Sequence, residues 1–175
     1  MSELMIIEGM KKLRIIEKKM SNNAQAIQRY ASMISTEKPL FETEDKQKKE
    51  IKSLIQSNRD LLDEYLDLKK RIEFSNLSTI VEMGGKKYSI SDLLVIKRKL
   101  AKIMLETFSS LNTHEGESRK RSFQYSDQSP QVVRFYKEED KIDGLKKWQD
   151  LYDNIESRLE VINATTPLSS LPITE

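Results

Sequence analysis

The sequence has no cysteine, few glycines and prolines, and no long apolar run. Without cysteine the chain cannot form disulfides, thiolate metal sites or a cysteine nucleophile, which fits a reducing compartment. Only 5 glycines and 4 prolines occur among 175 residues, so few positions force the backbone to reverse, and long helices are expected. The longest apolar run near the start, residues 4–7, is far too short for a signal peptide or a membrane span. We therefore expect a cytoplasmic protein with no membrane partner.

The charges nearly cancel, because 30 Lys and Arg residues stand against 28 Asp and Glu residues and leave a formal net charge of +2. That charge is too small for the whole surface to attract a polyanion, so a nucleic-acid site would have to be a local patch. Hydrophobic residues make up 37% of the chain and charged residues 33%. This mixture favours long amphipathic helices over a thick core.

Apolar residues recur in steps of three and four over two long segments, 3–35 and 44–74. This spacing predicts two helices, each with one buried stripe, and Ser2 can cap the first of them. Similar stripes predict helices over 91–111 and 138–163. The residues that we assign to the core or to an interface are Leu13, Met20, Ile27, Asn58, Leu61, Leu68, Leu100, Trp148, Ile155 and Leu159.

Asn58 is a polar residue in the apolar stripe of the second predicted helix, between Leu54 and Leu61. A polar residue at such a seam position often fixes the register or the number of partners, at some cost in stability. Alternatively, Asn58 lies at the edge of the stripe, and Ile55 and Leu62 take its place. The sequence leaves both interpretations open.

The pattern changes to alternation over residues 77–90, around the pair Gly84-Gly85. Two adjacent glycines can take the positive φ angles that tight hairpin turns require, so a small β-hairpin is predicted here. The helix that follows is capped either by Ser89 together with Asp92 or by Ser91 alone.

Residues 112–130 are polar and are predicted to form a loop. Phe123 and Tyr125 lie two positions apart, and Val133 and Phe135 repeat that spacing. This repeat predicts a second, irregular β-hairpin.

The last helix is expected to bury a stripe that begins at Ile142, and Trp148 on that stripe either packs in the core or anchors a partner. The tail, residues 164–175, contains Ser and Pro, and such ends usually fray unless something holds them. We expect neighbouring subunits to hold the tail. The alternative is that it folds back on its own chain.

These elements predict a mainly α fold in which residues 1–175 form a single elongated helical domain. We expect the first helix to pair with the second and the third with the fourth, as antiparallel helical hairpins in a coiled-coil bundle with one or two small β-hairpins. At about 1.5 Å per residue the first helix would be roughly 45 Å long, too long for a compact ball of this size. Packing against copies of the chain, or against a partner, would bury the stripes better.

The sequence offers no recognisable residues for catalysis, for a cofactor or for a metal ion. Gly84-Gly85-Lys86-Lys87 is the nearest match to a phosphate loop, but Ile80 and Lys87 stand where that loop needs Gly and Ser or Thr. A hairpin turn with solvated lysines explains this segment better. His114 is the only histidine, so no metal site can be built around a second imidazole. We therefore predict that the protein is not an enzyme and uses no cofactor.

Arg119, Lys120 and Arg121 precede Phe123 and Tyr125, and this group is the best candidate for nucleic-acid binding. The cations could neutralise phosphates while the rings stack on unpaired bases. Three basic residues in a polar loop are more often solvated, or paired with acidic residues of a neighbouring subunit.

Three segments of the chain resemble the septicolysin-like family of small helical proteins found in bacteria and phages. They are EGMKKL at 8–13, GKKYSISDLL at 85–94 and IESRLEVINATT at 155–166. The resemblance covers nearly the whole chain and implies an association with phages, but it carries over no catalytic residue. The loop at 112–130 is longer and more basic than the family pattern, which leaves the role of that loop open.

The sequence thus predicts a non-enzymatic structural protein that assembles with copies of itself or with other particle proteins. The resemblance adds that it would be a phage-particle component, a virion component assembled in the host cytoplasm. Two alternatives are a nucleic-acid-binding module that uses the basic segment 119–121, and an adaptor that binds a host protein through its helical surface.

Overall fold

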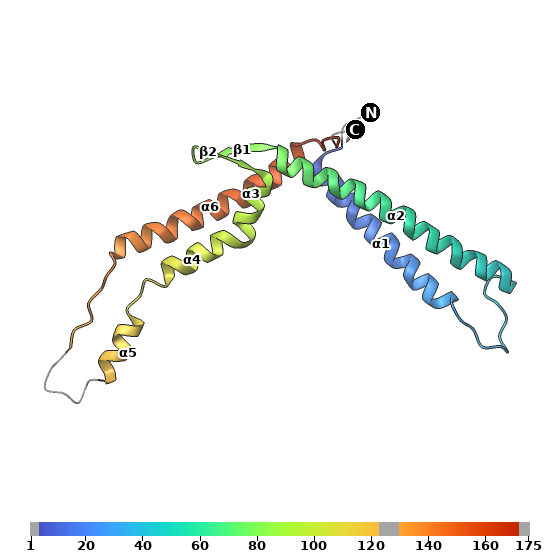
Figure 1. The fold of residues 1–175 in the computed structure, drawn as a ribbon, viewed down its shortest axis with the longest axis horizontal. Helices are drawn as coiled ribbons and strands as arrows, with labels where there is room; N and C mark the ends of the chain where they lie inside the picture. Colours follow the sequence, from blue (N-terminus) through green and yellow to red (C-terminus); the bar gives the residue numbers. More distant parts are fainter. Residues whose placement is uncertain (1–3, 123–129, 172–175) are drawn as a thin grey trace. The chain divides into compact units, whose positions relative to one another are not determined.

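The computed structural model describes residues 4–122 and 130–171 and is mainly α-helical with one two-stranded antiparallel hairpin, as predicted (Figure 1). The chain divides into two compact units, whereas its sequence predicts one elongated domain. The first unit combines residues 1–80 with 162–175, and the second comprises residues 81–161. In chain order the elements are α1 (Ile6–Tyr30), α2 (Glu44–Ser78), β1 (Ile80–Met83), β2 (Lys86–Ser89), α3 (Ile90–Val95), η1 (Ile96–Leu100), α4 (Ala101–Ser109), α5 (His114–Ser122) and α6 (Glu138–Thr165).

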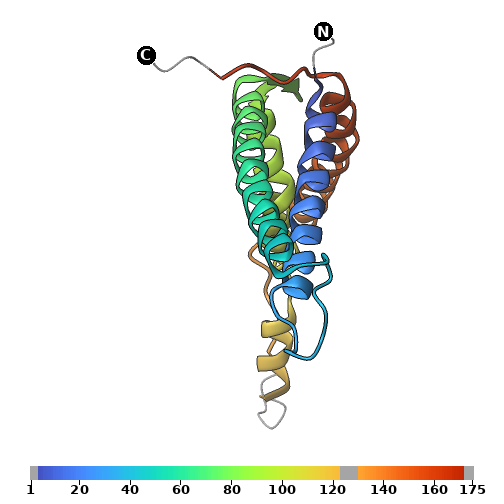
Figure 2. The ribbon, with the colours of Figure 1, turned by 90° about the vertical axis from the view of Figure 1, so that its right-hand side faces the viewer.

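In the first unit, α1 and α2 run side by side as an antiparallel hairpin, which both ribbon views show (Figure 1, Figure 2). From α1 the buried residues include Ile6, Leu13 and Ile16, and from α2 they include Leu68 and Ile72. These positions follow the predicted steps of three and four. The apolar stripes therefore account for the pairing of the first two helices.

α1 is shorter at both ends than the predicted helix. At its start the Met5 amide donates to the Glu8 carboxylate at 2.8 Å, whereas the predicted cap, Ser2, lies outside the described residues. At its end Gln47 Nε2 donates to the carbonyl oxygen of Tyr30 at 2.8 Å. That bond satisfies one of the carbonyl groups that a helix end leaves free. The predicted extension of this helix to residue 35 is therefore wrong.

The described part of the C-terminal tail, up to residue 171, folds back on its own chain within the first unit, which is the alternative to the expectation that neighbouring subunits hold it. The Ile6 amide donates to the Thr166 carbonyl oxygen at 2.9 Å, and the Leu168 amide donates to the Leu4 carbonyl oxygen at 2.7 Å. An antiparallel bridge between Met5 and the tail belongs to the same contact. Backbone hydrogen bonds thus fix the tail beside the start of α1.

The side chain of Leu168 completes this contact, because it is buried in a slot beside Gly9 and Ile72. A Cβ atom at position 9 would lie 2.7 Å from Leu168 Cδ1, so glycine makes room for the leucine. The Ser169 amide donates to Ser75 Oγ at 2.8 Å. The tail therefore contributes to the core of the first unit.

In the second unit, β1 and β2 form the predicted hairpin around Gly84 and Gly85, whose φ angles are 58° and 74°. Residues with side chains are strained at such angles, which explains the glycine pair. The hairpin is shorter than predicted because α2 extends further, with the Thr79 amide donating to the Ser75 carbonyl oxygen at 3.0 Å. The prediction of strand structure at Leu77 is therefore wrong.

Ser89 caps α3 together with Asp92, as the first of the two predicted alternatives has it. The Asp92 amide donates to Ser89 Oγ at 3.0 Å, and the Ser89 amide donates to the Asp92 carboxylate at 2.8 Å. The hydrogen bonds from the Ser89 backbone and side chain lower the pKa of Asp92, because they favour the charged carboxylate.

The third predicted helix is interrupted by η1, a π-helical turn. The Ala101 amide donates to the Ile96 carbonyl oxygen five residues back, and the extra residue turns every later side chain by about 100° relative to a continuous α-helix. Ala101 is consequently 0% exposed, whereas Leu100 is 42% exposed. The prediction that Leu100 lies on the buried stripe is wrong.

The predicted polar loop at 112–130 contains a helix, α5. The His114 amide donates to Asn112 Oδ1 at 3.0 Å near its start. Glu115 and Glu117 occupy its first turn and basic residues its last turn, which suits the helix dipole. Charge order along the segment thus favours a helix that apolar periodicity does not reveal.

The second β-hairpin is not found in the described part of this region. Residues 130–137 form no strand, and Val133 and Phe135 are exposed. Phe123 and Tyr125, the other half of the predicted hairpin, lie outside the described residues.

α6 packs along the α3–α4 segment of the second unit. Lys97 Nζ lies 2.9 Å from Glu156 Oε1, and a Cβ atom at Gly144 would overlap the ring of Phe108 at 2.3 Å. Ile155 is buried, but Ile142 lies about 140° away around the helix and is exposed. The predicted start of this stripe at Ile142 is wrong, because Gly144 occupies the inward position there.

Candidate interaction surfaces

The seam between α1 and α2 contains a polar layer built around Asn58. Asn23 Nδ2 donates to Asn58 Oδ1 at 2.9 Å, and Asn58 Nδ2 donates to the carbonyl oxygen of Met20 at 3.3 Å. Asn58 is half-buried, whereas Ile55 and Leu62 are exposed. Of the two readings of Asn58, the seam position is therefore the one the structure supports.

A second polar contact crosses the same seam between Tyr65 and Glu17. The Tyr65 hydroxyl donates to Glu17 Oε1 at 2.9 Å. This hydrogen bond is the main cause of a raised pKa at Tyr65, and burial and the nearby negative charge act in the same direction. The contact links the two helices on the side of the seam that water reaches.

The stripe residues predicted from the sequence differ in burial. Leu13, Leu68, Ile155 and Leu159 are buried. The half-buried members are Met20, Ile27, Asn58, Leu61 and Trp148. Trp148 is half-buried, so its burial does not distinguish the two predicted roles, a core residue and an exposed anchor.

A second apolar stripe lies on the face of α2 that α1 leaves uncovered. It consists of Ile55, Leu62 and Leu66, which are 40%, 45% and 45% exposed. Their spacings of seven and four residues place them on one line along the helix, about 110° around from the seam residues. We call this set the outer stripe.

The outer stripe is difficult to predict from the sequence, because its residues directly follow seam residues. Leu54 precedes Ile55, Leu61 precedes Leu62, and Tyr65 precedes Leu66. Such doublets are the sequence signal of a helix with two apolar faces, and a helix of this kind contacts two partners.

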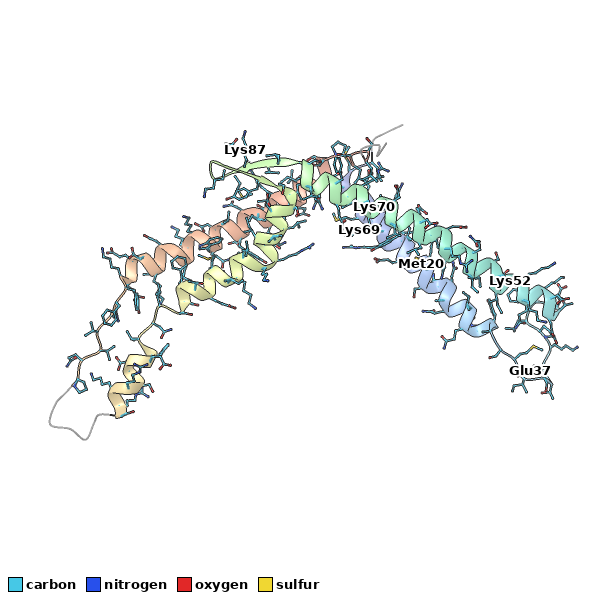
Figure 3. All side chains as sticks on the ribbon, in the orientation of Figure 1. Met20, Glu37, Lys52, Lys69, Lys70 and Lys87 are labelled. Carbon is cyan, nitrogen blue, oxygen red and sulfur yellow. The ribbon has the colours of Figure 1, made fainter. Side chains whose placement is uncertain are left out.

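The connector at the tip of the α1–α2 hairpin is tightly organised yet exposes apolar side chains. Tyr30 and Phe41 meet edge to face with ring centroids 4.8 Å apart. The buried Gln47 accepts a hydrogen bond from the Leu40 amide at 3.0 Å. Ile34 and Leu40 are exposed. Figure 3 labels Glu37 in this connector, and Met20 marks α1 on the way to it.

The basic residues predicted to bind nucleic acid lie on α5. Arg119 and Arg121 are exposed and Lys120 is half-buried. Three consecutive helical residues point about 100° apart and so do not share one face. Phe123 and Tyr125 lie outside the described residues, and nucleic-acid binding stays a prediction.

A groove of about 660 Å³ runs between the β-hairpin and α6 in the second unit. Its charged lining mixes Lys86, Lys146 and Lys147 with Asp143 and Asp150. Because both signs line the groove, it is not a strongly charged site for an anion or a cation. Figure 3 labels Lys87 on β2, the residue that follows Lys86.

Among the described residues no group of three or more acidic, histidine or cysteine side chains could hold a metal ion. No helix in that part of the chain combines the length and apolar character needed to cross a membrane. Comparison of the chain with models of protein families, with curated proteins and with solved structures gives no match.

Proposed function

We propose that the chain is a non-enzymatic helical assembly protein that associates with copies of itself. The outer stripe of α2 is the observation that carries this proposal. Three large aliphatic side chains in line on one long helix are typical of helix-to-helix packing, and α1 already fills the other apolar face of α2.

Exposure of the outer stripe to water is energetically unfavourable. Full burial of a Leu or Ile side chain contributes about 1.5–3 kcal/mol. Ile55, Leu62 and Leu66 retain 40–45% of their exposure in the single chain, so association has a substantial part of that contribution still to gain. Replacing one of them with a charged residue removes the gain and adds the cost of burying the charge.

The setting of the assembly is the second part of the proposal. The resemblance of segments 8–13, 85–94 and 155–166 to the septicolysin-like family supports a phage particle as that setting. Detection of the chain in purified particles by mass spectrometry would support this part, and its absence from every particle preparation would reject it without touching self-association.

Sedimentation velocity of wild type and two matched variants tests self-association. Leu62→Glu places a charge in the outer stripe, and we expect it to shift the protein to the monomer with unchanged helical circular dichroism. Glu64→Lys changes a charge about 160° around α2 from Leu62 and should leave the wild-type distribution intact. Equal sedimentation of the two variants would contradict the role of the outer stripe.

A further inference from the structure

We propose that two copies pair through antiparallel α2 helices, with Ile55 of one copy against Leu66 of the other and Arg59 against Asp63. This inference rests on the proposed self-association and names its geometry. The occupant of the outer stripe is thus the outer stripe of a second copy, related to the first by a two-fold axis.

The charges along the outer stripe limit where the apolar contact can lie. Positions at the heptad spacing of Ile55 and Leu66 are Lys52 before the stripe and Lys69 after it, and Figure 3 labels both on α2. The apolar contact is therefore confined to residues 55–66, with Arg59 inside it. Any pairing of two copies has to accommodate that arginine.

A parallel pairing in register meets this requirement poorly. It places Arg59 of one copy against Arg59 of the other, and likewise Lys48 against Lys48 and Glu73 against Glu73. Like charges in direct opposition destabilise such a contact. The second copy therefore has to run the other way.

An antiparallel pairing centred between residues 60 and 61 matches the side chains instead. Ile55 then lies against Leu66, and Lys48 lies against Glu73. Arg59 comes opposite Leu62 of the second copy and beside Asp63, which follows Leu62, and the two-fold axis forms each of these contacts twice. Lys52 of each copy approaches Lys69 of the other, whereas the parallel arrangement places Lys52 against Lys52 and Lys69 against Lys69.

The charged residues of the proposed contact are available for it. Within the described chain, neither Arg59 nor Asp63 has a hydrogen-bond or ion-pair partner. They lie about 40° apart in projection around α2, on the flank of the outer stripe that points away from the seam. Their side chains can therefore reach a second copy without breaking a contact of the first.

Charge reversal tests the pairing of Arg59 with Asp63. We expect Arg59→Glu alone and Asp63→Lys alone each to weaken self-association at least tenfold, because like charges then meet across the axis. Both changes in the same chain should restore it, and an equimolar mixture of the two single variants should form mixed dimers. Failure of both the double variant and the mixture to associate would overturn the pairing.

Engineered cysteines give a second test, because the natural chain contains none. A mixture of Ile55→Cys and Leu66→Cys chains should form a mixed disulfide dimer under mild oxidation. Ile55→Cys alone should not, because antiparallel pairing separates the two copies of residue 55 by about 16 Å, well beyond disulfide reach. Leu66→Cys mixed with Glu64→Cys, on the other side of α2, is the control and should stay uncrosslinked.

The two levels of the proposal fail in different ways. A wild-type chain that stays monomeric in sedimentation overturns self-association and the antiparallel geometry together. A wild-type chain that associates, but whose Ile55→Cys variant crosslinks with itself, overturns the antiparallel geometry alone.

Discussion

Asn58 and Asn23 form a hydrogen-bonded polar layer inside the apolar seam of the first unit. An apolar layer of α1 could also pack against the neighbouring apolar layer of α2, because contacts between leucine and isoleucine side chains are not directional. The asparagine pair removes that freedom, since sliding α1 along α2 leaves half-buried amides without partners. At the scale of residues, the seam obtains its strength from apolar contacts and its register from this layer.

We expect Asn58→Ala to lower the free energy of unfolding by about 1–2 kcal/mol, because Asn23 Nδ2 then keeps only its hydrogen bond to Ser57 Oγ at 3.2 Å and the Met20 carbonyl oxygen loses its bond from Asn58. Replacing both asparagines with leucine should be nearly neutral or stabilising, because the seam then contains neither of the two side-chain amides that need partners. Urea unfolding of the single and double variants measures both effects. Wild-type stability in Asn58→Ala would contradict the assignment.

The contact of Tyr65 with Glu17 predicts a change of stability in alkali. The pKa of Tyr65 is raised in the folded chain above its ordinary value of 10.0, so the folded state holds the phenol proton more tightly than the unfolded state. This contribution is fully present below pH 10.0 and is lost as the pH rises through the folded-state pKa. Wild type should therefore lose more thermal stability than Tyr65→Phe above that pH, and an unchanging gap between the two from neutral pH upward would argue against the contact.

The π-helical turn η1 determines which side of α4 is buried. A continuous α-helix from Leu93 would bury Leu100, and the sequence pattern gives no reason to expect otherwise. The additional residue in η1 moves Ala101 into the core instead. A one-residue change of phase thus separates an alanine in the core from a leucine at the surface.

A matched pair of variants tests this phase. Ala101→Glu should destabilise the chain by several kcal/mol, because it buries a charge without a partner. Leu100→Glu should change stability by only about 0.5 kcal/mol, because that position is exposed. Glutamate is a good helix former, so propensity does not confound the comparison. Thermal unfolding followed by circular dichroism measures both, and the reverse order would place the π-turn elsewhere.

Most of the helical elements are predictable, because their signals are local. The apolar spacing predicts the pairing of α1 with α2. Ser89 together with Asp92 predicts the start of α3, and the glycine pair predicts the β-turn. The buried face of α4 and the docking of Leu168 are not predictable in this way, because they depend on contacts between residues far apart in sequence. For the proposed contact surface, the sequence shows that Ile55 and Leu62 are apolar residues near the seam of α2. It does not show that they are exposed, because their exposure depends on which face of α2 is covered by α1.

At the scale of the whole molecule, the first unit combines the start of the chain with its end. Leu168 occupies the slot beside Gly9, so the core of the first unit includes a residue more than a hundred positions after Gly9 in the sequence. Loss of the tail therefore weakens a unit that is otherwise built from the first 80 residues.

We expect Leu168→Ala to lower the free energy of unfolding by about 2–5 kcal/mol, as for other buried leucines. The same substitution at Leu77, which is 62% exposed, is the control and should cost well under 1 kcal/mol. Urea unfolding compares the two variants. Equal costs would show that the tail does not dock in solution.

Self-association through the outer stripe of α2 is tested by the mass of the unmodified protein in solution, measured by light scattering over a range of concentrations. We expect at least twice the chain mass of 20.4 kDa at the higher concentrations. A mass of 20.4 kDa at every concentration would contradict it.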